Sequence, residues 1–127
     1  MSPARMSKIE SGIRIVLEFN EAFNRHDTIG MMKLMSDECV IEDAHPAPDG
    51  KVVSGKEAVA RHWQGFFRDS PQAHIDIEEI FGLGYRCIMR WKYSWTDAEW
   101  GKKYERGVDI FQIKEGFIST RLSYVKG

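Results

Sequence analysis

The chain has 127 residues, of which 43% are hydrophobic and 29% charged, and its formal net charge at pH 7 is −1. This length suits one domain with one core, and this apolar content excludes a disordered chain. The balanced charge gives no electrostatic footprint for nucleic acid and no polybasic membrane signal. No secretory signal and no run of about 20 apolar residues is present, so we expect a cytoplasmic protein.

The first predicted element is a helix, because apolar residues recur at helical spacing over residues 9–23. Its end is expected at residues 24–27, where polar residues interrupt the apolar pattern. Ser7 and Glu10 form a capping-box pattern at its start. We therefore interpret residues 1–8 as a loose terminus of the single domain that the whole chain forms.

The middle of the chain predicts two more helices with a strand and a loop between them. A methionine-rich helix is expected over Thr28 to Met35, and a short apolar strand over Cys39 to Asp43. Residues 44–50 contain two prolines and a glycine, which is typical of a loop. Residues 54–57 form a second capping-box pattern, which predicts a third helix that ends near Arg68.

The last part of the chain predicts an antiparallel meander of four strands over residues 73–81, 85–95, 103–114 and 117–125. The strand 85–95 has the clearest two-residue period, with apolar and aromatic residues at its odd positions. Three helices followed by long antiparallel strands predict an α+β fold with separate layers. A curved sheet wrapped against helices leaves a cone-shaped hollow.

Two aspartates are the leading candidates for chemistry. Asp43 ends the first predicted strand, and Asp109 lies inside a later strand among Val108, Ile110 and Phe111. A carboxyl group in such surroundings is costly to bury unless it is paired, protonated or used. Two carboxyl groups beside one apolar pocket can divide the roles of acid and base. We expect Asp109 to stay neutral, because its neighbours are apolar and no Lys or Arg shares its face on that strand nearby.

The side chains that share the inner face of the strands are expected to border one cavity for a small apolar or aromatic ligand. Besides the two aspartates, the residues expected to bind the ligand are Phe19, His45, Trp63, Met89, Trp91, Tyr93, Phe111 and Tyr124. The choice of Tyr124 assumes that the even residues of the last strand face inward. His26, His62 and His74 are interpreted as surface or helix-face residues, and Cys39 and Cys87 as buried free thiols. The histidines form no metal-ligand pattern, so we expect neither a metal nor a cofactor.

Four segments carry a resemblance to a known family: residues 24–27, 39–43, 53–59 and 106–113. In order and content they resemble the NTF2-like superfamily, and within it the branch of SnoaL-like polyketide cyclases and ketosteroid isomerases. The resemblance extends over residues 9–125. It implies a cystatin-like cone, in which three N-terminal helices pack on a curved, mostly antiparallel sheet.

The resemblance also implies roles for single residues. Asp43 falls where steroid isomerases keep their general base, and Asp109 where they keep a protonated acid that donates to an enolate oxygen. Phe19 and Trp63 occupy positions where those enzymes carry pocket tyrosines, and Phe19 cannot donate a hydrogen bond. Some superfamily members are epoxide hydrolases with an Asp-Arg-Asp set. That interpretation is disfavoured here, because Arg90 is expected on the opposite face from the aromatic row.

Two functions from different classes stay open at this point. The first is a cofactor-free isomerase or cyclase that moves a proton on an apolar carbonyl compound, with Asp43 as base and Asp109 as acid. The second is a non-catalytic module that binds a ligand or serves dimerisation. In both cases a homodimer is expected through the outer face of the sheet, where Ile88, Val108 and Ile110 are apolar.

Overall fold

The computed structural model describes residues 3–127 and consists of three helices and one six-stranded sheet. The helices are α1 (Pro3–Asn24), α2 (Thr28–Met32) and α3 (Lys56–Asp69). The strands are β1 (Met35–Glu42), β2 (Val52–Ser54), β3 (His74–Leu83), β4 (Arg86–Asp97), β5 (Gly101–Lys114) and β6 (Phe117–Val125). The strand order is β2-β1-β6-β5-β4-β3, with β1 and β6 parallel and the other neighbours antiparallel.

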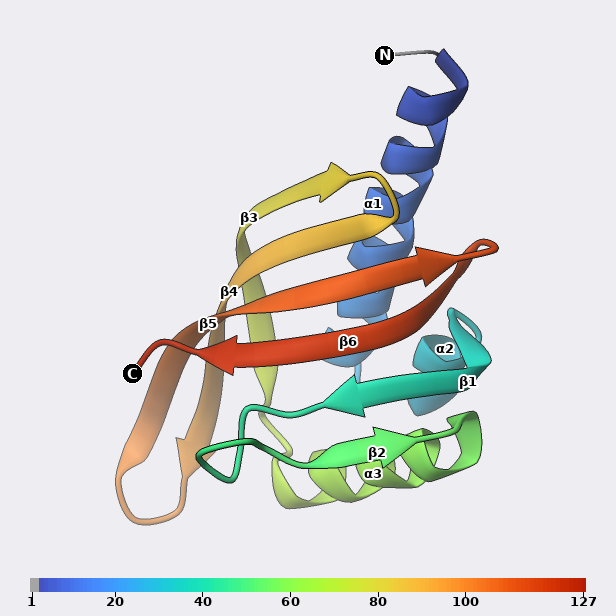
Figure 1. Ribbon diagram of the computed structural model, residues 1–127. Helices are drawn as coiled ribbons and strands as arrows, with labels where there is room; N and C mark the ends of the chain where they lie inside the picture. Colours follow the sequence, from blue (N-terminus) through green and yellow to red (C-terminus); the bar gives the residue numbers. More distant parts are fainter. Residues whose placement is uncertain (1–2) are drawn as a thin grey trace.

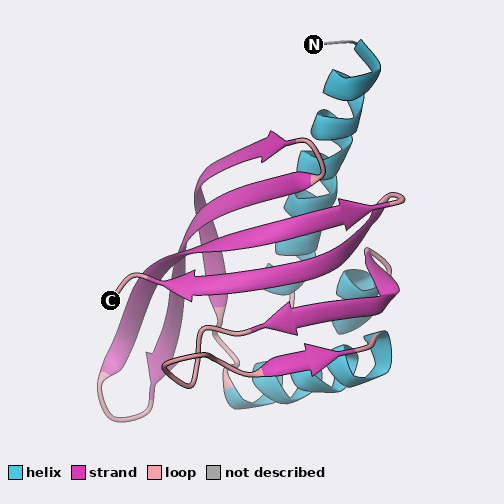
Figure 2. Ribbon diagram, viewed as in Figure 1, coloured by secondary structure: helices cyan, strands magenta, loops and turns pink. Residues whose placement is uncertain are grey.

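The helices lie together on one side of a strongly curved sheet (Figures 1 and 2). Helix α1 packs against β3, while α3 lies beside β1 and β2 (Figure 1). This arrangement confirms the predicted α+β cone. It buries one face of the sheet against helices, as a layered domain requires.

The first helix begins earlier than expected. Helix α1 starts at Pro3, so residues 3–8 are helical rather than a loose terminus, and Ser7 lies inside the helix. Met1 and Ser2 lie outside the described residues. Proline suits the first position of a helix because its φ angle is already helical, and good helix formers follow it.

Other details of the middle segment also differ from the prediction. Helix α2 ends at Met32 rather than Met35, and strand β1 begins at Met35. The short strand β2 was not predicted, because three residues are too few to display a period. Helix α3 is capped by Gly55, whose φ is 89°, and no side chain caps it, so the predicted capping box is absent.

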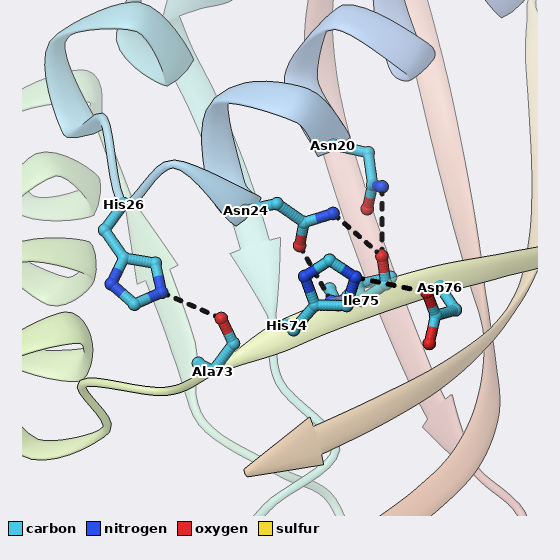
Figure 3. Close-up of polar contacts among 7 residues, drawn as sticks. All are labelled: Asn20, Asn24, His26, Ala73, His74, Ile75 and Asp76. Carbon is cyan, nitrogen blue, oxygen red and sulfur yellow. Dashed lines mark hydrogen bonds and ion pairs between the residues drawn. The ribbon is translucent and has the colours of Figure 1, made fainter.

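Polar side chains at the end of α1 fix the start of β3 (Figure 3). The Asn24 side chain accepts a hydrogen bond from Ile75 N at 2.8 Å and donates one to Ile75 O at 2.9 Å. Asn20 donates to the same carbonyl at 3.3 Å, and His26 Nε2 lies 2.8 Å from Ala73 O. These bonds satisfy backbone groups at the sheet edge and hold Ile75 against the core.

The core lies between the helices and the concave face of the sheet. Phe23 of α1 packs edge-on against Trp63 and Phe67 of α3, with ring centroids 5.7 and 5.1 Å apart. Cys39 and Cys87 are free and buried, as predicted. Burial raises the pKa of Cys87 to about 11, so this thiol is protonated and inert at neutral pH.

The last strand changes which of its residues face inward. Ile113 of β5 pairs with Ile118, whereas the adjacent Gln112 pairs with Thr120, so Ser119 is an extra residue in β6. A bulge of this kind reverses the inward and outward alternation beyond it. Ile118 is buried before the bulge, and the odd residues Arg121 and Ser123 are buried after it.

Candidate functional site

A cavity of about 240 Å³ opens between α1, α3 and the concave side of the sheet. Its polar lining consists of Asp43, His45, Glu105, Arg121 and Ser123. Its remaining lining is aromatic and aliphatic: Phe23, Ala44, Trp63, Phe66, Ile75, Trp91, Tyr93 and Val125. A mostly apolar cavity with a few convergent polar groups is the usual form of a small-molecule site.

Five of the residues expected from the sequence border this cavity: Asp43, His45, Trp63, Trp91 and Tyr93. Three others, Phe19, Met89 and Phe111, are buried in the core beside it and do not line it. Tyr124 is 50% exposed and lies on the outer face of β6, because the bulge at Ser119 reverses the parity that the prediction assumed.

Asp109 lies beneath the cavity wall rather than in it. The side chain is fully buried, and its Oδ1 accepts hydrogen bonds from Trp91 Nε1 at 2.9 Å and from Ser123 Oγ at 2.5 Å. Its Oδ2 lies 2.8 Å from Arg121 Nε, which makes an ion pair. No Lys or Arg near Asp109 on β5 shares its face, as expected, but the adjacent strand β6 supplies this guanidinium. A proton-donating role does not follow from these surroundings.

Gly107 makes room for the Trp91 side chain that reaches Asp109. Trp91 and Gly107 are partners across β4 and β5. A Cβ atom on Gly107 would stand 2.6 Å from Trp91 Cζ2, closer than real Cβ contacts. The absence of a side chain here lets the indole lie flat over β5, with its N–H directed to the neighbouring carboxylate.

Arg121 joins the two aspartates. It is only 7% exposed, and besides its contact with Asp109 its Nη1 lies 3.5 Å from Asp43 Oδ1. Its guanidinium carbon is 5.1 Å from the centre of the Trp63 ring, within the range of a cation–π contact. A buried guanidinium needs such partners, and here they hold its position at the cavity wall.

Asp43 is the carboxylate that reaches the cavity. It directly follows β1, which ends at Glu42 and not at Asp43 as predicted. Its side chain is 24% exposed, and its Oδ2 lies 2.9 Å from His62 Nε2. Burial acts to raise the pKa of Asp43, but the contacts with His62 and Arg121 outweigh it, and the net pKa lies below the ordinary value. Asp43 is therefore ionised at neutral pH and can accept a proton.

Sequence reasoning missed Arg121, His62 and Ser123. The even residues of β6 are more apolar than the odd ones, so the pattern predicted that the even residues face inward. The bulge at Ser119 turns the odd residues Arg121 and Ser123 inward instead. His62 stands on α3 between Arg61 and Trp63, and nothing in the pattern of this helix marks its contact with Asp43. Arg90 lies on the outer face and pairs with Glu79 at 3.1 Å, as its predicted position implies.

The mouth of the cavity carries one further polar pair. His45 Nε2 lies 3.3 Å from a carboxylate oxygen of Glu105, and the His45 side chain is 66% exposed. This contact links the loop after β1 to β5. Within residues 3–127, no group of three His, Cys, Asp or Glu side chains is arranged to hold a metal ion. None of the described helices has the length and apolar character needed to cross a membrane.

The fold is that of the NTF2-like proteins. An NTF2-like protein of unknown function from Mesorhizobium loti has 35% sequence identity and a TM-score of 0.81, and the alignment covers 94% of each chain. A structure named as a candidate polyketide cyclase, from Xanthomonas campestris pv. campestris, has 20% identity and a TM-score of 0.76 over 94% of this chain and 93% of that one.

A third solved structure is a Catenulispora acidiphila protein with a ketosteroid isomerase-like fold, in complex with trimethylamine. It has 14% identity and a TM-score of 0.77, over 87% of this chain and 83% of that one. The chain belongs to the SnoaL-like domain family, whose model matches residues 16–120. None of the curated protein sequences matches it.

Proposed function

We propose that this protein is a cofactor-free enzyme that moves a proton on a small apolar carbonyl compound, with Asp43 as the general base. The observation that carries the proposal is the position of Asp43, an ionised carboxylate on the wall of an otherwise apolar cavity. Solved structures of the same fold include a candidate polyketide cyclase, which is consistent with this reaction class.

The proposed step is the removal of a proton from the carbon next to a carbonyl group. Asp43 takes the proton, and the electron pair of the C–H bond moves to form an enolate, with negative charge on the oxygen. Arg121 lies beside Asp43 and supplies the positive charge that stabilises this oxygen. Asp43 then returns the proton to a different carbon, which completes an isomerisation without any cofactor.

The size of the cavity favours a substrate with one ring. A cavity of about 150 Å³ holds benzene, and pockets for drug-sized ligands begin near about 300 Å³. The cavity here, at about 240 Å³, lies between the two. It therefore favours a monocyclic compound over a four-ring steroid.

The test is the isomerisation of cyclohex-3-en-1-one to cyclohex-2-en-1-one, followed by the ultraviolet absorbance of the conjugated product. The wild-type protein should accelerate it, and Asp43→Asn should remove the acceleration. Asp76→Asn is the matched control, because Asp76 is an exposed aspartate on the outer face of β3 that pairs with His74. Equal rates for wild type and Asp43→Asn would reject the proposal.

A second candidate function is the hydrolysis of a small epoxide, favoured by the Asp43–Arg121–Asp109 set. In that reaction Asp43 takes a proton from water, the water oxygen bonds to a ring carbon, and the carbon–oxygen bond of the epoxide breaks. The alkoxide that forms takes this proton from Asp43, which regenerates the carboxylate and gives a diol. Conversion of cyclohexene oxide to its diol, measured by gas chromatography, distinguishes this candidate from the isomerase.

The non-catalytic alternative is a ligand-binding module. Binding of a small molecule without turnover would support it.

In either case we propose a homodimer formed through the outer face of the sheet. Phe81, Ile88, Ile110 and Leu122 are partners across four adjacent strands. They make an apolar row on the side away from the helices, and such rows usually mark a contact between proteins.

A further inference from the structure

Two N–H groups at the cavity wall lack hydrogen-bond partners. Trp63 Nε1 and Arg121 Nη1 are buried, and neither donates a hydrogen bond to any described residue. Both residues line the cavity, and they are 2% and 7% exposed. Arg121 Nη1 is 3.5 Å from Asp43 Oδ1, which is an ion-pair contact and too long for a good hydrogen bond. Buried donors without acceptors are costly, so a ligand atom that accepts from them is favoured.

The two donors belong to side chains in contact with each other. The Arg121 guanidinium lies over the Trp63 ring, with 5.1 Å between its central carbon and the ring centroid. Asp43 stands beside them as the proton acceptor of the cavity. Most of the remaining lining is apolar and suits a hydrocarbon ring. The cavity therefore combines one apolar volume, one base and one pair of donors.

We infer that Trp63 Nε1 and Arg121 Nη1 form the oxygen-binding subsite of this cavity, and that its ligand is a neutral one-ring ketone or aldehyde. This inference rests on the proposed function, since the same oxygen would carry the enolate charge. The ligand is neutral because the carboxylates of Asp43 and Glu105 already line the cavity and Asp109 lies behind its wall, against the one guanidinium of Arg121. A carboxylate ligand would add a further negative charge to this site.

The subsite supplies the hydrogen bond that Phe19 cannot make. Phe19 is 3% exposed in the core and packs edge-on against Phe111 at 6.0 Å, so it offers neither a donor nor a place on the wall. The donors come instead from α3 and β6. The oxygen of the ligand lies against Trp63 and Arg121, and the carbon that loses the proton faces Asp43.

The experiment compares three probes of nearly equal shape by isothermal titration calorimetry with the wild-type protein. Acetophenone has the carbonyl oxygen, α-methylstyrene replaces it by a CH₂ group, and benzoate carries a negative charge. We expect acetophenone to bind at least about tenfold more tightly than α-methylstyrene, as one good hydrogen bond predicts. Benzoate should bind more weakly than acetophenone, and acetophenone should shift the Trp63 indole N–H resonance in NMR spectra.

Variants then assign the preference to the subsite. Trp63→Phe keeps an aromatic ring but removes the N–H, so the preference for acetophenone over α-methylstyrene should fall by about tenfold. Trp100→Phe is the matched control, because Trp100 is 72% exposed on the β4–β5 hairpin, and it should keep the full preference. The comparison of probes on the wild-type protein requires no variant to fold.

Equal affinity for acetophenone and α-methylstyrene would overturn the inference, and so would tighter binding of benzoate. The outcome is separable from that of the proposed function, because binding is measured without turnover. Preference for acetophenone without any isomerisation of cyclohexenone would support the subsite and reject the enzyme. Isomerisation without that preference would support the enzyme and reject the subsite.

Discussion

Arg121 Nε lies 2.8 Å from Asp109 Oδ2, inside the wall that separates the cavity from the core. Asp109 also accepts hydrogen bonds from Trp91 and Ser123. With two hydrogen-bond donors and one ion-pair partner around its buried carboxylate, Asp109 holds the guanidinium in place and does not itself reach the cavity. Asp109 is thus a positioning residue, and the catalytic part of the proposal falls on Asp43.

Replacement of Asp109 should destabilise the protein. Asp109→Asn leaves the buried Arg121 guanidinium without its nearer counter-ion, and loss of one partner of a buried pair costs about 3–5 kcal/mol. Urea unfolding measures this as a lower midpoint with an unchanged slope. Asp76→Asn, at an exposed site, should change stability by no more than about 0.5 kcal/mol. A change below about 1 kcal/mol in Asp109→Asn would show that Arg121 does not depend on the pair.

The ionisation of Asp43 should make stability depend on pH in the acid range. Its pKa in the folded protein is lower than its ordinary value of 3.8, because contacts with His62 and Arg121 outweigh the effect of burial. The ionised carboxylate therefore stabilises the fold fully at pH values above its ordinary pKa. This contribution is lost as the pH falls through the lower pKa that Asp43 has in the folded protein. Urea unfolding of wild type and Asp43→Asn between about pH 2 and 6 should show a shallower acid decline in the variant. Parallel declines would contradict this account of the pair.

Substitution of Gly107 should disturb the link between Trp91 and Asp109. In Gly107→Ala the new Cβ would collide with the backbone carbonyl oxygen of Tyr124 and stand 2.6 Å from the Trp91 ring, so both β6 and the indole must move, at a cost of about 1–3 kcal/mol. The change is measured by thermal unfolding and by near-ultraviolet circular dichroism of the tryptophans. Gly12→Ala is the control. Gly12 lies inside helix α1, and its new Cβ would lie 3.5 Å from Ile113, an ordinary contact distance, so alanine should be neutral or stabilising there. An equally stable Gly107→Ala protein with an unchanged spectrum would refute the packing argument.

Disruption of the apolar row on the outer face should prevent dimerisation. Ile110 pairs with Ile88 on one side and Leu122 on the other, at the middle of the row. Sedimentation velocity at micromolar concentration should find a dimer for the wild type and a monomer for Ile110→Asp. Ile29→Asp, at a residue of α2 that is 72% exposed away from the sheet, should remain dimeric. A wild-type monomer would reject the interface.

The alternation of apolar residues was enough to predict the fold and much of the cavity wall. Trp91 and Tyr93 face inward because the two-residue period of β4 runs without interruption over them. Asp43 was found because a carboxylate at the end of an apolar strand stands out against its neighbours. Such signals are local, and each depends on a few adjacent residues.

The parts that could not be predicted depend on contacts between distant segments. The contact of Asp43 with His62 joins the end of β1 to α3, and no pattern in either segment marks it. Tyr124 was placed inside because an uninterrupted alternation was assumed for β6. The bulge that turns Arg121 inward is seen only in the register of β6 with β5, where Ser119 is an extra residue. The Ser119 hydroxyl donates a hydrogen bond to Gln112 O at 3.1 Å.

The exchange of protons between ligand and solvent tests the role of Asp43 most directly, because it requires only the first step of the proposed reaction. Cyclohexanone is incubated with the protein in D₂O, and the loss of its α-proton signal is followed by NMR. The wild-type protein and Asp76→Asn should accelerate this loss above the rate in buffer, and Asp43→Asn should not. Equal acceleration by wild type and Asp43→Asn would contradict the assignment of Asp43 as the base.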